Sequence, residues 1–266
     1  MIGRFVGALI RALALVIVIA SPAFLLPDVS RASQEITLII AGIAAAFTLF
    51  EYASTHPGLI DFRFAPPYNR VRFIAFTVQI LSVVFICRAD AGSDLFATAV
   101  LGMADRAVAM TSFPLSPVDL AVTMIAGDSE ASLQLLIRRA AAISVLVTFL
   151  FLAAFGVFLW IVRWPVVRRD FNLWINLPTF EPGYGRDVER RLYRDGFVNM
   201  LVGVGFLYLL PVLLSQSFGW FDPAVLRAYQ PLVWGTTFWT FLSGSLVIRG
   251  AAILKVAWLV RRSRQL

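Results

Sequence analysis

Apolar residues along this chain fall into six long blocks, separated by segments rich in charged residues, proline and glycine. Each block is close to the length of about 20 residues at which an α-helix crosses a hydrocarbon core about 30 Å thick. The pattern predicts an all-α membrane protein, a bundle of six transmembrane helices forming one integral membrane domain over residues 1–266. The predicted spans are residues 5–26, 36–52, 71–87, 140–164, 197–218 and 232–252.

Composition agrees with this class. Hydrophobic residues make up 59% of the chain and charged residues 15%, whereas a soluble domain has about 45–50% and about 25%. The first block follows Arg4 and could be a signal peptide, but Ala20-Ser21-Pro22-Ala23 is a poor cleavage site. We therefore expect the first helix to be retained.

The basic residues indicate the orientation. With a cytoplasmic amino terminus, 17 of the 23 lysine and arginine residues lie inside, and the net charge is +10 inside and −3 outside. Cytoplasmic segments of membrane proteins carry such an excess of basic residues. Nearly all of these residues are arginine, which is typical of a high-GC bacterial genome. We expect a multi-pass protein of the bacterial inner membrane, with both termini in the cytoplasm.

The longest outside segment, residues 88–139, predicts surface helices. Residues 94–110 are amphipathic, with Asp94 and Asp105 near one face and Phe96 and Val100 near the other. We expect a periplasmic lid of surface helices. Such a lid either shields the end of the bundle and contacts headgroups, or closes over a pocket or a partner.

Helix boundaries within this segment can be predicted from individual residues. Ser116 followed by Pro117 is typical of a helix start, and Gly127 can end that helix. Asp128 or Ser129 is expected to cap a further helix that runs unbroken into the fourth span.

Two cytoplasmic loops, residues 53–70 and 165–196, are expected to be ordered. Each holds a short alternation of apolar residues between proline and glycine, in Ile60–Phe64 and in Phe171–Leu177. Such alternation is typical of short strands. Because isolated strands are marginally stable, we expect the two segments to meet as a two-stranded ribbon.

Charge inside the predicted spans is scarce. Arg11 and Glu51 lie at similar shallow depths near the cytoplasmic ends of consecutive spans, which are usually neighbours. They are the candidates for a structural ion pair, and the alternative is that both side chains extend to water. No acid or base lies at mid-depth, which disfavours proton-coupled transport.

Polar and small residues within the last two spans offer a second candidate. Hydroxyl side chains at helical spacing in the sixth span could line a polar path or could pack against neighbouring helices. They are Thr236, Thr240 and Ser243. Gly203, Gly205 and Pro211 in the fifth span mark either a broken transporter helix or a kink with close packing.

Cysteine and histidine, the residues that most often form disulfides and metal sites, are nearly absent from the sequence. Cys87 and His56 are each the only residue of their type, so neither an internal disulfide nor a histidine-rich metal centre can form. We find no nucleotide-binding loop, metalloprotease motif or nucleophile elbow. We predict no catalytic, cofactor-binding or metal-binding residues and no cofactor.

A group of arginines precedes the fifth span. It consists of Arg186, Arg190, Arg191 and Arg194. Acidic residues are interspersed among them, so a salt-bridged helical stem is the simple interpretation. The alternative is contact with a partner or with anionic lipid headgroups. Nucleic-acid binding is not expected, because the arginines form no continuous soluble face.

Three hypotheses for function remain. The leading one is a non-catalytic accessory or assembly subunit of a larger inner-membrane complex, because ordered loops on a rigid scaffold are where interaction sites usually lie. The second is a small transporter or channel that uses the sixth-span hydroxyls. The third is a membrane-interface enzyme that holds a lipid-linked phosphate with cytoplasmic arginines.

Overall fold

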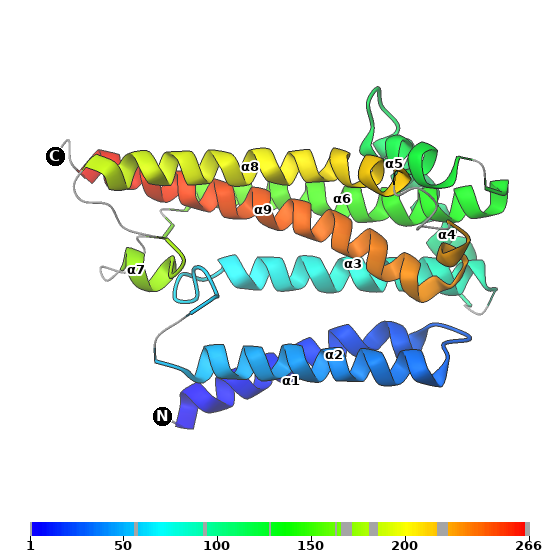
Figure 1. The fold of residues 1–266 in the computed structure, drawn as a ribbon, viewed down its shortest axis with the longest axis horizontal. Coiled ribbons are helices and arrows are strands. Elements are labelled where there is room, and N and C mark those ends of the chain that lie inside the picture. The colour runs from blue at the N-terminus through cyan, green and yellow to red at the C-terminus, as the bar shows by residue number, and fades with distance from the viewer. Residues whose placement is uncertain are drawn as a thin grey trace. The chain divides into compact units, whose positions relative to one another are not determined.

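The structure is a computed structural model that describes residues 2–55, 58–92, 95–127, 129–162, 164–165, 172–180, 186–216 and 223–263. Where the sequence predicts one membrane domain, these residues group into two compact units. Unit 1 comprises Met1–Phe73 and Arg163–Pro182, and unit 2 comprises Ile74–Val162 and Gly183–Leu266. Figure 1 shows the helices of both units.

The described residues contain six helices that are long and apolar enough to cross a membrane, and they contain no strand. These helices are α1 (Ile2–Leu25), α2 (Arg31–Ala53), α3 (Tyr68–Asp90), α6 (Ala131–Ile161), α8 (Arg186–Ser215) and α9 (Tyr229–Ser263). The prediction of an all-α membrane bundle with six spans is confirmed. Most of these helices extend beyond the predicted limits, because the apolar pattern marks only the part suited to hydrocarbon.

In unit 1, α1 and α2 form an antiparallel hairpin (Figure 1). Ser30 begins α2, and its hydroxyl accepts a hydrogen bond from the Ser33 amide at 3.2 Å, as an N-cap does. Ala8, Ala23 and Ala41 are fully buried. Their small side chains let the two helix backbones approach closely.

The two predicted loop segments of unit 1 meet, which confirms that part of the prediction. The Phe62 amide donates to the Asn176 carbonyl at 2.6 Å. Phe62 also packs against Tyr68 and Trp164, with ring centroids 4.7 and 5.1 Å away. All three rings are buried, and the Trp164 indole donates to the Ala65 carbonyl at 3.2 Å.

The predicted ribbon of strands is wrong. Within the first segment, residues 61–64 form turns, and Phe62 has a left-handed backbone with φ of 51°. In the second segment, Phe171 lies outside the described residues and Leu173–Asn176 form the short helix α7. The alternation is too short to separate a strand from a turn whose aromatic side chain is buried.

In unit 2, α8 and α9 pack closely near the carboxyl end of α9 and diverge toward α5 (Figure 1). Glycines make this possible. A Cβ atom on Gly250 would lie 2.6 Å from the Gly196 carbonyl oxygen, and one on Gly203 would lie 2.8 Å from the Ser243 carbonyl oxygen. A Cβ on Gly205 would meet nothing closer than 3.9 Å. Gly203 therefore serves helix packing, and α8 continues through Pro211 without a break.

Two surface helices, α4 (Ala97–Thr111) and α5 (Pro117–Ala126), lie at the end of unit 2 away from the carboxyl terminus (Figure 1). The predicted limits of α5 are confirmed. The Ser116 hydroxyl accepts from the Val118 amide at 3.2 Å, Pro117 is the first helical residue, and Gly127 is the C-cap.

The following helix also runs unbroken into the fourth span, as predicted. Its cap differs from the expectation, because Glu130 occupies the N-cap position of α6 and makes no capping bond with its side chain. Ser129 is therefore not the cap. Asp128, and likewise Asp94 before α4, lie outside the described residues.

Candidate binding cavity

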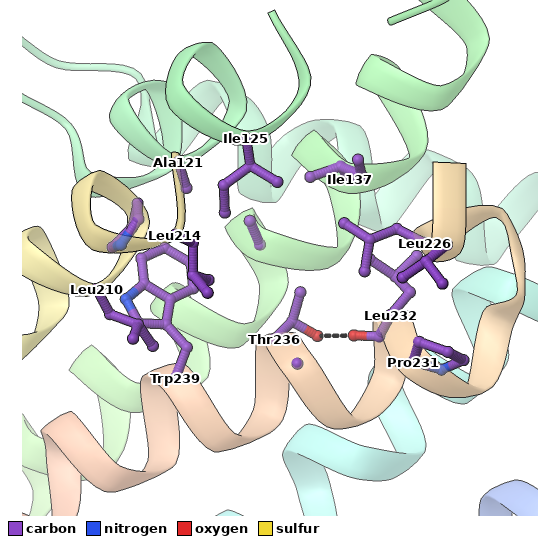
Figure 2. Close-up of a pocket in the computed structure, with 14 residues that line it drawn as sticks. Ala121, Ile125, Ile137, Leu210, Leu214, Leu226, Pro231, Leu232, Thr236 and Trp239 are labelled. Carbon is purple, nitrogen blue, oxygen red and sulfur yellow. Dashed lines mark hydrogen bonds between the residues drawn. The ribbon is translucent and has the colours of Figure 1, made fainter. Parts of the chain in front are cut away.

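An apolar cavity of about 160 Å³ lies beneath α5 in unit 2 (Figure 2). It is lined by residues of α5, α6, α8, α9 and the short 3₁₀ helix η1 (Pro223–Arg227). Lining side chains include Ala121, Ile125, Ile137, Leu214, Leu226 and Trp239. Of the two surface helices, α5 lines this cavity and α4 contributes none of its described lining residues.

The polar atoms that reach the cavity wall are already bonded within the protein. The Thr236 hydroxyl donates to the Leu232 carbonyl at 2.8 Å (Figure 2), and the Trp239 indole donates to the Leu207 carbonyl at 2.9 Å. Among the residues that the structure describes, no titratable side chain lines the cavity. Apolar cavities of this kind bind apolar guests, so the site can hold a hydrocarbon.

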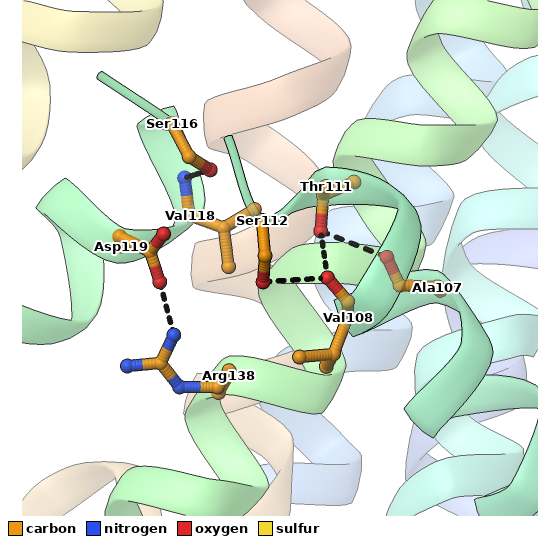
Figure 3. Close-up of polar contacts among 8 residues, drawn as sticks. All are labelled: Ala107, Val108, Thr111, Ser112, Ser116, Val118, Asp119 and Arg138. Atoms are coloured by element: carbon orange, nitrogen blue, oxygen red, sulfur yellow. Dashed lines mark hydrogen bonds and ion pairs between the residues drawn. The ribbon is translucent and has the colours of Figure 1, made fainter. Parts of the chain in front are cut away.

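Ion pairs fix the elements around the cavity. Arg138 of α6 reaches Asp119 of α5 in a short contact between the side chains (Figure 3). Arg139, the next residue, holds Asp105 of α4 with two hydrogen bonds of 2.7 and 2.9 Å. This fork-shaped geometry is favourable for an arginine and a carboxylate, so both surface helices are attached to α6.

A third pair lies on the η1 side. Arg227 donates to the Glu130 carboxylate at 2.6 Å, and this hydrogen bond holds the pKa of that carboxyl below its ordinary value. Arg227 directly follows the lining residue Leu226, and Arg138 directly follows the lining residue Ile137. Two arginines are therefore next in the chain to lining residues, and each forms an ion pair with a carboxylate.

The predicted polar path of the sixth span is formed by hydroxyls that bond to their own helix. Thr236, Thr240 and Ser243 each donate to the carbonyl four residues earlier, at 2.8–2.9 Å. All three side chains are buried. Thr236 alone of the three lines the cavity. These three hydroxyl side chains thus contribute to helix packing, and their hydrogen bonds are satisfied within α9.

Sequence reasoning missed a buried amide in the third span. Gln79 is at the middle of α3, and its amide donates to the Thr148 hydroxyl of α6 at 2.6 Å. The Thr148 hydroxyl also lies 3.4 Å from the Thr240 carbonyl of α9. A lone glutamine within an apolar block was the available signal. The cluster joins three spans through hydrogen bonds, which is a common role for polar side chains in membranes.

The structure gives Arg11 and Glu51 separate partners within unit 1. One carboxylate oxygen of Glu51 accepts from the backbone amides of Gly58, Leu59 and Ile60 at 2.7, 2.9 and 3.0 Å. The Arg11 guanidinium donates to the Gly7 carbonyl at 2.6 Å and lies over the Tyr52 ring, 4.8 Å from its centroid. The loop after α2 folds back over Glu51, and an ion pair between Arg11 and Glu51 stays a prediction.

Arg63 completes this cluster. Its guanidinium donates to the backbone carbonyls of Glu51 and Ser54, the latter at 2.6 Å. It also lies over the rings of Tyr52 and Phe64, at 5.7 and 4.7 Å. Two arginines thus meet the Tyr52 ring, while the buried carboxylate is occupied by backbone amides.

The arginines before the fifth span lie in the first turns of α8, with Arg190 and Arg194 exposed. Arg194 bonds the neighbouring Asp195 at 3.1 Å. The helical stem is therefore observed, whereas contact of this group with lipid or a partner remains a prediction. The side chain of Arg186 lies outside the described residues, and Arg191 is partly exposed.

Comparison with known proteins yields no match: no family model fits the chain, and neither a curated protein nor a solved structure is significantly similar to it.

Proposed function

We propose that this chain is a non-catalytic membrane subunit, an accessory or assembly component of a larger membrane complex. The observation that carries the proposal is an uncovered face of α2. Six large apolar side chains of α2 are between 54% and 74% exposed. They are Ile36, Ile39, Ile40, Ile43, Phe47 and Phe50.

The spacing of these residues favours a helical partner. Five of them, all except Ile39, are separated by four, three, four and three positions, which is the 3.5-residue repeat of helices that pack along a seam. Contact with lipid requires an apolar surface but no such repeat. Gly42 lies on the same uncovered side, and a Cβ atom there would have no neighbour within 4 Å, so a second helix could approach closely.

The other two hypotheses have less support. A transporter needs a polar route, whereas the hydroxyls of the sixth span bond their own helix and the cavity wall carries no charge. An enzyme acting on a lipid-linked phosphate needs an available acid near its arginines. Arg11 and Arg63 do converge on the ring of Tyr52, the residue after Glu51, but three backbone amides occupy the Glu51 carboxylate.

The proposed location is a bacterial inner membrane, with both termini in the cytoplasm. Reporter fusions after Arg31, within residues 93–116 and after Asp222 are expected to report the outside. Fusions after His56, within residues 181–185 and at Leu266 are expected to report the cytoplasm. The basis is the excess of arginine on the second set of segments. A cytoplasmic signal from residues 93–116 would contradict the six-span topology.

Affinity purification in a mild detergent tests the subunit proposal. We expect the tagged chain to copurify with a stoichiometric membrane partner, and we expect the double variant Ile43→Ala/Phe47→Ala to lose at least nine-tenths of it. The matched control is Leu209→Ala/Leu213→Ala, which truncates two comparably exposed side chains of α8. Recovery of the chain alone, or equal loss of the partner in both double variants, would refute the proposal.

A further inference from the structure

We propose that the cavity beneath α5 binds a hydrocarbon chain of a phospholipid, whose phosphate is held by Arg138 and Arg227. This binding site is in unit 2 and is independent of the α2 face that carries the proposed function. Its two parts, an apolar cavity and adjacent guanidinium groups, match the two parts of a phospholipid.

The cavity suits a hydrocarbon in size and chemistry. Its volume is about 160 Å³, and a dry apolar cavity of about 150 Å³ accepts a guest the size of benzene. A segment of several methylene groups therefore fits. Because the Thr236 hydroxyl and the Trp239 indole are bonded to backbone carbonyls, a hydrocarbon guest would displace no hydrogen bond.

The cavity also lies at the depth of lipid chains. Thr236 and Trp239 follow the first residue of α9, Tyr229, by seven and ten positions. At 1.5 Å per residue, they lie about 10 and about 15 Å along the helix from its start. The hydrocarbon core is about 30 Å thick, so the cavity is within the half of the core nearest α5.

Two arginines are next in the chain to lining residues of the cavity, Arg138 after Ile137 of α6 and Arg227 after Leu226 of η1. The side chains of Arg138 and Arg227 are 31% and 51% exposed. Each guanidinium contacts its carboxylate, Asp119 or Glu130, through one terminal nitrogen. An arginine has five N–H donors in a fixed fork, so donors remain for a phosphate oxygen. The paired carboxylates reduce the local positive charge, which leaves the hydrocarbon chain to supply much of the affinity.

Gly235 provides a way to block the cavity without disturbing its walls. It lines the cavity, and a Cβ atom added there would have no neighbour within 4 Å. Gly235→Phe would direct a ring into the space that the lipid chain would occupy. Gly156 is the matched control, because it lies in the membrane-spanning helix α6, is absent from the cavity wall and also has no neighbour within 4 Å of an added Cβ.

The test measures binding to the purified full chain, freed of lipid in detergent, by native mass spectrometry and by the shift in thermal unfolding. The probes are dioleoyl phosphatidylglycerol, dioleoylglycerol, which has the same chains without phosphate, and inorganic phosphate. We expect the phospholipid to bind the original protein and Gly156→Phe equally, and Gly235→Phe at least tenfold more weakly. The double variant Arg138→Gln/Arg227→Gln should bind the phospholipid no better than dioleoylglycerol.

Equal binding by Gly235→Phe and Gly156→Phe, or no binding by the original protein, would overturn the proposal. A response to inorganic phosphate alone equal to that of the phospholipid would do the same. So would a copurifying polypeptide that Gly235→Phe displaces, because the occupant would then be a protein. If Gly235→Phe does not fold, Gly235→Leu fills the same space with a smaller group. It should also bind the phospholipid at least tenfold more weakly than the original protein does.

Discussion

Gly250→Ala is expected to lower the free energy of unfolding by about 3 kcal/mol, the upper part of the range for overpacking a close-packed interior. The added Cβ atom would lie 2.5 Å from Met200 Cγ and 2.6 Å from the Gly196 carbonyl oxygen. The second of these is a backbone atom of the facing helix and cannot rotate away. The expected result is separation of α8 from α9, measured as a lower unfolding temperature and a lower denaturant midpoint in detergent.

A matched pair on α8 provides the control. Gly203→Ala places a Cβ atom 2.8 Å from the Ser243 carbonyl oxygen and should also destabilise the protein. Gly205→Ala, two residues later, meets nothing closer than 3.9 Å. It should be neutral or slightly stabilising, because alanine favours a helix over glycine by about 1 kcal/mol. Equal effects at the two positions would contradict the role of glycine in this contact.

Glu51→Ala is expected to lower the free energy of unfolding by about 2–3 kcal/mol, because three backbone amides lose a charged acceptor. The side chain is only 6% exposed, and the amides of Gly58, Leu59 and Ile60 lie within 3.0 Å of it. The loop that follows α2 should then open. Thermal unfolding would show the loss of stability, and faster protease cleavage within residues 58–64 would locate it.

Two further variants serve as a control for Glu51→Ala and as a test of its coupling to Arg11. Glu35→Ala removes an exposed carboxylate of the same helix, whose contact with Arg31 is 4.0 Å, and should change stability by less than about 1 kcal/mol. A loss as large as that of Glu51→Ala would contradict the proposed role of the loop amides. Arg11→Ala, alone and combined with Glu51→Ala, measures the coupling between these two charges. Additive losses would show that they do not interact.

The membrane class and the six spans could be predicted from sequence because hydrocarbon imposes a simple local rule. A backbone inside the bilayer must satisfy its own hydrogen bonds, so each long apolar block becomes a helix. The start of α5 could also be predicted from nearby residues, because Ser116 and Pro117 stabilise the first turn of the helix. These features depend on residues close together in the chain.

The loops were harder because their structure depends on distant residues. Phe62 takes a left-handed backbone within a cluster that includes Tyr68 and Trp164, and its amide bonds Asn176. The alternation around Phe62 contains none of this information. Trp164 itself was assigned to the end of the fourth span, yet α6 ends at Ile161 and the ring belongs to the loop cluster.

The sequence by itself determined that this chain spans a membrane as helices, since that follows from the length and polarity of single segments. Tertiary structure alone decided the partners of its few polar groups. Glu51 binds backbone amides because a loop folds over it, and the cavity exists because five elements from distant parts of the chain leave a space that their side chains do not fill. The size of such a space depends on how helices pack against one another, which no single helix specifies.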